Sequence, residues 1–364
     1  MMKKIAVLLP LCVLLAAAVW AFAAGDAGDP LASLSYLTGT FTDMVEDQVD
    51  QRLDASDAEL LAGGSDSAAG GTAQSAATWT ESRLKQDDVL RGVTGTNVLL
   101  LAGGMQVTYS GGTVVDVTTG TTVSSGTALV RNHRYMVAED TEAAFTVTSK
   151  TAVVDYQGIY TFTYSNGVDY NAMASALKTL HLFKGTFTGY GEGFDLEAAP
   201  TRLQALIMFI RVLGEEEEAL AWTGMTPFTD IAKGSEAERY VGYAYGKGYT
   251  NGYSATQFKP AGAVNAYQYT EFVLRAMGYS SAANTDLSDT LIRAGEAGVL
   301  TAGEIEMLQK SAFLRAELVY ISYYALDTVL SDSSCTLGER LMEKGVFTDW
   351  EWETARSQVS GWRL

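Results

Sequence analysis

A helical pattern that recurs three times in the second half of the chain constrains the fold more than any other feature of the sequence. In each copy, a helix end is followed by a short run with a glycine, an extended stretch, and a second helix with apolar residues at helical spacing. The copies contain ALKTLHLFKGTF, YGKGYTNGYS and AGEAGVLTAGE, and GERLMEKGVFTD starts a fourth. We therefore expect an all-α repeat domain over residues 167–350, divided into 167–222, 223–281, 282–330 and a partial unit, 331–350.

A glycine in each turn sets the alignment between the copies. Residues 182–185 align with 249–252 and, allowing one position of drift, with 300–303. The aligned glycines are Gly185, Gly252 and Gly303. Each is predicted to end a helix in the left-handed conformation, which glycine adopts without steric cost.

Three short motifs accompany the repeats. A Phe-x-Asp segment, Phe228-Thr229-Asp230, precedes the first helix of copy two and recurs as Phe347-Thr348-Asp349 in the fragment. A Lys-Gly-x-x-Asn-Gly turn and a Phe-x-Pro segment follow in copy two, and an arginine starts a helix in copies one and three. This combination resembles the S-layer homology family over about half of the chain.

The resemblance implies both a fold and a ligand. Members of the family pack three repeats into a pseudo-threefold helical bundle, and grooves between the repeats bind secondary cell-wall polysaccharide, often through a pyruvylated sugar. The Thr-Arg-Ala-Glu motif of the family puts an arginine on the first helical turn. A guanidinium fork suits the carboxylate of such a sugar, and free N–H groups at the helix start would face the ligand.

The motif is only partly present in this sequence. Copy one has Thr201-Arg202 and then Leu-Gln in place of Ala-Glu, whereas copy three has Arg315-Ala-Glu with Leu in place of Thr. Copy two has Asn265-Ala266, so we expect that copy to keep a helix cap but no binding arginine. The residues predicted to bind wall polymer are Arg202, Arg315, Thr201, Asp230 and Gly252.

Each of these residues also has a purely structural interpretation. Arg202 and Arg315 can be surface arginines that pair with Glu197 or Glu317. Asp230, or Thr229 beside it, can cap the helix that is expected to begin near Ser235.

The N-terminus has the three parts of a secretory signal peptide. MMKK is positively charged, IAVLLPLCVLLAAAVWAF is apolar, and AFA fits the small-residue cleavage rule. We expect residues 1–24 to be removed, so that the mature protein is secreted to the cell wall or surface of a bacterium and is not membrane-embedded. An uncleaved anchor is the alternative, whereas lipid attachment at Cys12 is excluded because Leu11 stands where a small residue is needed.

The remaining N-terminal half changes character twice. Residues 25–62 contain apolar residues at four-residue steps and are predicted to be helical, and the small polar residues 63–77 form a linker. Residues 78–166 alternate with period two between Gly-rich turns, which predicts a small antiparallel β-sandwich or barrel. The stretch LKQDDVLRGVTGTNVLLLAGG resembles the FecR periplasmic domain. With residues 351–364 as a tail, the fold class is α+β multidomain.

Charge and chemistry exclude several functions. The formal net charge of −18 argues against nucleic acid and anionic lipid as partners. After signal cleavage Cys335 is the single cysteine, and it lies in a separate segment from His133 and His181 with no catalytic motif around them. The run Glu215–Glu218 points in several directions around a helix and makes no metal site.

We therefore expect a non-catalytic surface protein without cofactor or metal, anchored to wall polysaccharide. The alternative is a structural protein whose degenerate repeats mediate protein–protein contact, including self-association.

Overall fold

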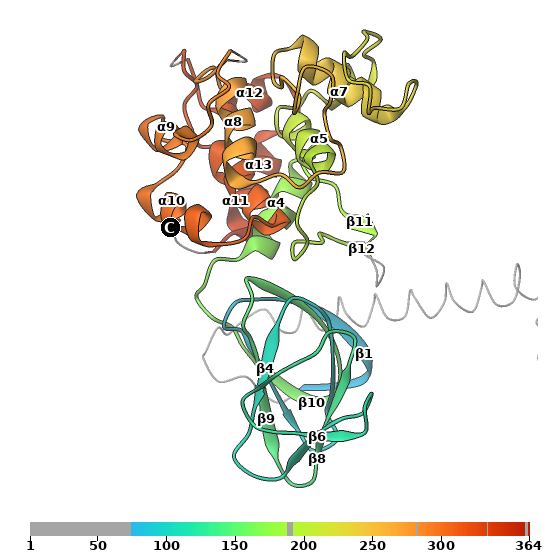
Figure 1. The fold of residues 1–364 in the computed structure, drawn as a ribbon. Helices are drawn as coiled ribbons and strands as arrows, with labels where there is room; N and C mark the ends of the chain where they lie inside the picture. The colour runs from blue at the N-terminus through green and yellow to red at the C-terminus, as the bar shows by residue number, and fades with distance from the viewer. Residues whose placement is uncertain (1–73, 188–191, 282, 333, 361–362) are drawn as a thin grey trace, which may run out of the picture. The chain divides into compact units, whose positions relative to one another are not determined.

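The computed structural model describes residues 74–364 apart from 188–191, 282, 333 and 361–362. Strands come first and helices follow, as the colours of Figure 1 show from blue to red. The expected α+β class, with antiparallel strands before a helical region, is confirmed. The predicted signal peptide and the predicted helical segment 25–62 lie outside the described residues.

The strands form one antiparallel, nearly closed sheet with the order β6-β5-β8-β3-β10-β2-β9-β4-β7, and β1 also pairs with β10. Their bounds are β1 Gln74–Lys85, β2 Val89–Val93, β3 Asn97–Ala102, β4 Met105–Thr108, β5 Thr113–Asp116, β6 Thr121–Val123, β7 Thr127–Ala128, β8 Arg134–Ala138, β9 Glu142–Val147 and β10 Thr151–Thr163. This is the barrel form of the predicted β domain.

Period-two patterning explains why the sheet curls around one core. In β3, Val98 and Leu100 are fully buried while Leu99 between them is half-buried, and Phe145 and Val154 contribute to the same core from β9 and β10. The first strand begins at Gln74, which lies within the predicted linker 63–77. The other strands are rich in Val, Thr and aromatic residues, which favour β structure.

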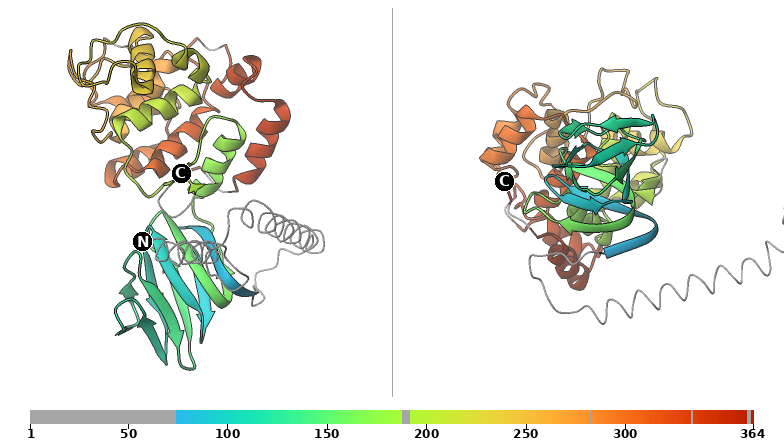
Figure 2. Two further views of the ribbon diagram at one scale, coloured as in Figure 1. Left: turned by 90° about the vertical axis from the view of Figure 1, so that its right-hand side faces the viewer. Right: turned by 90° about the horizontal axis from the view of Figure 1, so that it is seen from below.

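The helical region begins at Tyr170, and the helices gather into one cluster in both views of Figure 2. The elements are α4 Tyr170–Thr179, β11 Thr186–Phe187, β12 Glu192–Gly193, α5 Arg202–Val212, α6 Glu216–Leu220, α7 Glu236–Gly246, α8 Ala266–Ala276, α9 Thr290–Glu296, α10 Ala302–Lys310, α11 Arg315–Ala325, α12 Leu337–Glu343 and α13 Asp349–Gln358. Helix α13 therefore covers much of the segment expected to be a tail.

The second helices of the three copies, α5, α8 and α11, pack against one another in pairs. The ring centroids of Phe209 on α5 and Phe272 on α8 are 5.9 Å apart, and the hydroxyls of Tyr269 on α8 and Ser322 on α11 are 2.5 Å apart. All four residues are buried, so these helices share one core. The arrangement of the repeats around a threefold axis stays a prediction.

The first helix of each copy ends in the same way, but not at the predicted glycines. His181, Gly248 and Gly298 have positive φ angles, and the next residue in each case donates its N–H to a carbonyl five residues back. Gly185 and Gly303 do not have positive φ, and Gly303 lies inside α10. The prediction was therefore wrong for these two glycines, and Gly252 also lies beyond the end of α7.

These helix ends also correct the alignment of copy three. Leu182 and Tyr249, which follow the left-handed residues of copies one and two, correspond to Val299 rather than to Leu300. The misalignment arose because the alignment treats Gly303 as a turn glycine, although Thr301 and Glu304 form a capping box that places Gly303 in the first turn of a helix.

Gly252 does have the predicted left-handed conformation, with φ of +79°, and it needs glycine for a second reason. A Cβ atom at Gly252 would lie 2.2 Å from Cε1 of the buried Phe228 ring. The nearby Asp230 does not cap α7, since Ser235 does so through its side chain. The carboxylate of Asp230 instead accepts the N–H groups of Phe258 and Lys259, at 2.9 and 2.7 Å, and the alternative of a helix cap was wrong.

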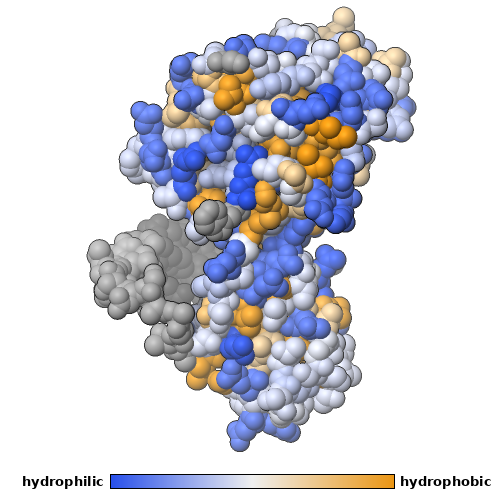
Figure 3. Space-filling view, turned by 90° about the vertical axis from the view of Figure 1, so that its left-hand side faces the viewer, coloured by the Kyte–Doolittle hydropathy of each residue, from blue (hydrophilic) through white to orange (hydrophobic). Residues whose placement is uncertain are grey.

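Hydrophilic atoms cover most of the face drawn in Figure 3, with smaller hydrophobic areas between them. None of the helices within the described part of the chain is long and apolar enough to cross a membrane.

We predict that Gly252→Ala lowers the free energy of unfolding by about 2–5 kcal/mol, because the new side chain combines a left-handed backbone with overpacking against Phe228. Gly234→Ala is the matched control. Its φ is +74°, but a Cβ there meets nothing within 4 Å, so the loss should be only about 1–2 kcal/mol. Urea unfolding of both variants measures the difference, and equal losses would contradict this account of Gly252.

Candidate functional site

The start of α5 is held by the loop that precedes α8. The N–H groups of Arg202 and Leu203 donate to the carbonyls of Gly262 and Pro260, at 2.8 and 3.1 Å. Within this loop, Lys259 has a positive φ of 59°, which turns the chain toward α5. A loop from copy two therefore satisfies two of the amides that every helix start leaves without an intrahelical partner.

The start of α11 is held in the same way by the loop that precedes α5. The N–H groups of Arg315 and Ala316 donate to the carbonyls of Ala198 and Leu196, at 2.9 and 3.1 Å. The position equivalent to Lys259 is Asp195, and it also has a positive φ, of 51°. In both places, carbonyls from a loop of one repeat accept the first two amides of a helix in another repeat. We call this contact the interlock, and it joins two pairs of repeats.

These contacts correct one expectation about the helix starts. The third amide of α5, that of Gln204, donates to the Thr201 hydroxyl at 3.2 Å, so the first three amides of α5 all have protein partners. In α11 the N–H groups of the first two residues are likewise used, and Glu317 accepts the N–H of Leu314. The prediction that free N–H groups face a ligand was therefore wrong for the first three amides of α5 and the first two of α11, where the guanidinium groups are the donors left for a ligand.

Arg202 lines a groove between copies one and two, which we call the Arg202 groove. Its cavity volume is about 420 Å³. The lining combines Arg202 with the turn of copy two, one face of α8 and the chain after α8: Thr250, Asn251, Gly252, Tyr253, Ser254, Ala255, Gln268, Glu271, Phe272, Arg275, Asn284, Thr285 and Leu287.

The guanidinium of Arg202 is buried without a neutralising carboxylate. The residue is only 8% exposed, and its Cζ atom lies 5.2 Å from the ring centroid of Phe258 and 5.8 Å from that of Phe272. Its Nη2 donates to the Gly252 carbonyl at 3.2 Å, while Nε is buried with no hydrogen-bond partner. Within the described residues it makes no ion pair, and burial, with the charge of Arg275, lowers its pKa.

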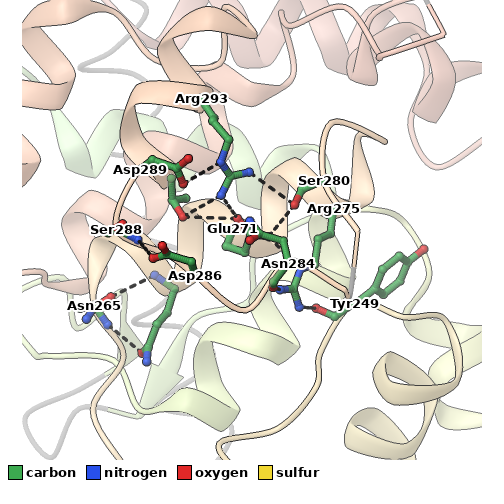
Figure 4. Close-up of polar contacts among 12 residues, drawn as sticks. Tyr249, Asn265, Glu271, Arg275, Ser280, Asn284, Asp286, Ser288, Asp289 and Arg293 are labelled. Atoms are coloured by element: carbon green, nitrogen blue, oxygen red, sulfur yellow. Dashed lines mark hydrogen bonds and ion pairs between the residues drawn. The ribbon is translucent and has the colours of Figure 1, made fainter.

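The opposite wall of this groove is already balanced in charge, as Figure 4 shows around Glu271. Glu271 is 1% exposed and accepts from Arg275 Nε at 3.0 Å and from Arg293 Nη2 at 2.8 Å. Arg275 also donates to the carbonyl of Asn284 at 2.6 Å, which ties the chain after α8 to the helix. Arg293 also pairs with Asp289 at 2.9 Å, so two carboxylates balance these two arginines and Arg202 is the unbalanced charge.

Arg315 lines a second groove, the Arg315 groove, between copies one and three. Its cavity volume is about 330 Å³. The lining residues are Phe183, Lys184, Gly185, Pro200, Gln204, Ile207, Met208, Arg211, Arg315 and Leu318. These positions repeat those of the Arg202 groove, because Gln204 and Arg211 stand on α5 where Gln268 and Arg275 stand on α8.

The two grooves differ in how the first-turn arginine is neutralised. Arg315 Nη1 lies 3.4 Å from Asp195 Oδ2, and its Cζ lies 5.9 Å from the Phe183 ring. Burial lowers the pKa of Arg315, and the charge of Asp195 opposes that effect. At the equivalent position of the other loop stands Lys259, whose Nζ lies over the Tyr253 ring instead. One loop residue therefore decides which arginine has a carboxylate partner.

Glu216 holds two further cations at the Arg315 groove. Its carboxylate lies 2.8 Å from Arg211 Nε and 2.6 Å from Lys184 Nζ, and it accepts from Tyr240 Oη at 2.7 Å. Burial alone would raise its pKa, but the hydrogen bonds from Lys184, Tyr240 and Arg211 outweigh this and lower the pKa to about 2. Glu216 thus stays ionised and competes with any anion in the groove for Arg211 and Lys184.

The predicted site residues are only partly brought together. Arg202 and Gly252 meet in one groove and Arg315 lines the other, whereas Thr201 serves as the cap of α5 and Asp230 lines neither groove. Asn265 caps α8 through Gln268, as expected for copy two. The predicted pairing of the arginines with Glu197 or Glu317 is not what the structure has, since Arg315 pairs with Asp195.

The sequence interpretation missed the groove-lining arginines Arg211 and Arg275. The sequence contained a signal for both arginines. Each lies the same number of residues after its helix cap, and each follows a glutamine in the first turn of the same helix. An alignment of α5 with α8 side by side would have found both pairs.

The two histidines and the cysteine do not come together in one catalytic site. His133 pairs with Asp116, His181 pairs with Glu351, and Cys335 neighbours Ser334. In the part of the chain that the structure describes, no group of three or more His, Cys, Asp or Glu residues is placed to hold a metal ion.

Comparison with known proteins identifies copy two. Residues 227–265 match the family model of the S-layer homology domain. The match spans the Phe-x-Asp segment, α7, the Lys-Gly-x-x-Asn-Gly turn and the Phe-x-Pro segment, and it ends at the cap of α8. A search of curated proteins gave no match. The chain is therefore an S-layer homology domain-containing protein, and such a domain indicates attachment to the bacterial cell surface through a cell-wall polymer.

Proposed function

We propose that this protein is a secreted, non-catalytic surface protein that binds an anionic cell-wall polysaccharide in the Arg202 and Arg315 grooves. The observation that carries the proposal is the Arg202 guanidinium, which is buried at the edge of a groove without any carboxylate partner among the described residues. A buried charge without a partner is costly, and an anionic ligand would supply the missing partner.

The lining of the Arg202 groove suits an acidic sugar. A carboxylate, such as that of a pyruvyl ketal, can accept charge-assisted hydrogen bonds from Arg202. The side-chain amide nitrogen of Gln268 can donate to a sugar hydroxyl, and Tyr253, which is exposed at the rim, offers a flat apolar face to a sugar ring. A free sugar hydroxyl would not compensate the arginine, so we propose that the acidic substituent is the group recognised.

Two similar grooves on one chain favour a polymer over a small molecule. A repeating polysaccharide can occupy both grooves at once, and the second contact then forms at a high effective concentration. Each groove can bind weakly while the chain is still held firmly at the wall. In this proposal the three repeats stand around a pseudo-threefold axis, and the β-barrel is carried at the surface by the helical part.

The first prediction concerns the two first-turn arginines. Arg202→Ala and Arg315→Ala should each weaken binding to purified pyruvylated wall polymer by about tenfold or more, because each removes a charge-assisted hydrogen bond. The double variant should show no retention in a co-sedimentation assay. Circular dichroism and thermal unfolding of each variant confirm that it is folded.

Arg239→Ala is the control for this experiment, since Arg239 is exposed on α7 and lines neither groove. It should bind as the native protein does. Equal retention of the double variant and of the control would remove the proposed site, and a native protein that is not retained at all would remove the anchoring role. If the native protein instead self-associates without polymer, the assembly alternative gains support.

A second prediction uses the competition at Glu216. In an Arg202→Ala background, where the Arg315 groove alone reports binding, Glu216→Gln should tighten polymer binding by about threefold to tenfold at low salt. The reason is that Arg211 and Lys184 lose the carboxylate that holds them. Glu217→Gln is the matched control, because Glu217 is exposed and makes neither contact. Isothermal titration measures both affinities, and equal or weaker binding for Glu216→Gln would show that these cations do not reach the ligand.

A further inference from the structure

Neither the start of α8 nor the far turn of α11 carries the arginine that lines the grooves elsewhere. The first residue of α8 is Ala266, where α5 and α11 have arginine. Counted from the helix cap, α11 has Tyr324 at the position that Arg211 occupies on α5 and Arg275 on α8. One turn earlier, α11 has Tyr320 where α8 has Glu271. This face of α11, which we call the Tyr324 face, therefore carries no cation of its own at these positions.

An arginine from the end of the sequence lies on this face. The Cζ atom of Arg363 is 4.8 Å from the ring centroid of Tyr324, and the N–H of Leu364 donates to Tyr320 Oη at 3.1 Å. In Figure 1 the mark for the C-terminus stands beside α10, the helix that flanks the Tyr324 face. A segment far along the chain thus covers the surface that corresponds to the grooves of α5 and α8.

Arg363 makes the same backbone contact as Arg275. Its Nη2 donates to the carbonyl of Val299 at 2.7 Å. Val299 follows the left-handed Gly298, just as Tyr249 follows Gly248, and Arg275 Nη1 donates to the carbonyl of Tyr249 at 3.5 Å. The guanidinium of Arg363 therefore stands where a helix arginine stands in copy two, although it arrives from a different part of the chain.

A buried carboxylate receives this guanidinium. The side chain of Glu304 is 0% exposed, and it binds Arg363 through two parallel contacts, Nε to Oε1 at 2.7 Å and Nη2 to Oε2 at 3.0 Å. Glu304 also accepts the N–H of Thr301 and the hydroxyl of Tyr320. Among the residues that the structure describes, Arg363 is the one cation paired with Glu304.

The surrounding backbone accommodates the segment closely. The Thr301 hydroxyl donates to the carbonyl oxygen of Leu364. A Cβ atom at Gly303 would lie 3.0 Å from the carbonyl carbon of Leu364, so glycine at this position leaves the room that the segment occupies. Contacts from α10, α11 and the end of α9 therefore converge on two consecutive residues.

We infer that Glu304, Tyr320, Tyr324 and the Val299 carbonyl form a guanidinium-binding site whose ligand is the chain's own Arg363-Leu364 segment. The segment supplies the cation that α11 lacks and covers the Tyr324 face from outside the repeats. This site is separate from the two grooves, and the bound segment covers the face of α11 that corresponds to the groove walls on α5 and α8.

The experiment measures thermal unfolding of the full chain in four variants. Arg363→Ala should lower the melting temperature by about 6–15 °C, because it leaves the buried Glu304 carboxylate without its cation. Arg363→Lys, which keeps the charge but loses the planar fork, should lie between this variant and the native protein. Arg363→Ala with Glu304→Gln should recover at least half of the loss, since glutamine keeps the cap of Thr301 without a charge. Arg356→Ala is the control, because Arg356 stacks on a tryptophan and pairs with the exposed Asp327.

Chemical rescue then tests the ligand class directly. Ethylguanidinium at low millimolar concentration should raise the melting temperature of Arg363→Ala by a few degrees and leave the double variant and Arg356→Ala unchanged. Equal losses for Arg363→Ala and Arg356→Ala, or rescue that persists without Glu304, would overturn the inference. If Arg363→Ala does not fold, a folded double variant supports the site and an unfolded one contradicts it. None of these outcomes depends on polysaccharide binding.

Discussion

The helical half depends on the need to satisfy the free amides at the starts of α5 and α11. In α5 and α11 the first two N–H groups are bound by carbonyls from a loop of another repeat. Because an unpaired buried amide is costly, this contact fixes how far one repeat is turned against the next. It also places the side chain of the first helical residue at the neighbouring repeat's turn. The grooves are a consequence of the interlock, since it aims Arg202 and Arg315 into them.

The same interlock permits the grooves to differ in charge. The loop position with positive φ is Asp195 in one copy and Lys259 in the other, and both fulfil the backbone role. The aspartate reaches Arg315, whereas the lysine turns to Tyr253 and leaves Arg202 without a carboxylate. Backbone geometry is therefore preserved while the electrostatics change. Since an unbalanced guanidinium gains more from an incoming anion, the Arg202 groove is the stronger candidate of the two.

Sequence patterning predicted what depends on local chemistry. The Asn265 cap, the left-handed Gly252 and the period-two strands all follow from neighbouring residues, and each is confirmed. Sequence patterning failed where the role of a side chain depends on a partner that is distant in the sequence. Asp230 binds amides near Phe258 rather than capping α7, because the loop brings those amides within reach only in the folded chain. Gly303 looked like a turn glycine because its neighbours resemble a turn, although the preceding threonine caps a helix.

Copy two shows that a repeat can keep the residues that maintain its fold while it lacks the arginine that would bind a ligand. It is the copy that the S-layer homology model matches, yet its long helix begins with alanine rather than arginine. Its turn and its α8 face nevertheless build the wall of the Arg202 groove, and copy one contributes the arginine. In both arginine grooves, one copy thus supplies the first-turn arginine and another supplies most of the wall, and the start of copy three completes the Arg202 groove. A copy can lose its arginine and keep its place in the site, provided that its loop still binds the neighbouring helix start. Where the cation is missing altogether, on the Tyr324 face, Arg363 from outside the repeats stands in its position.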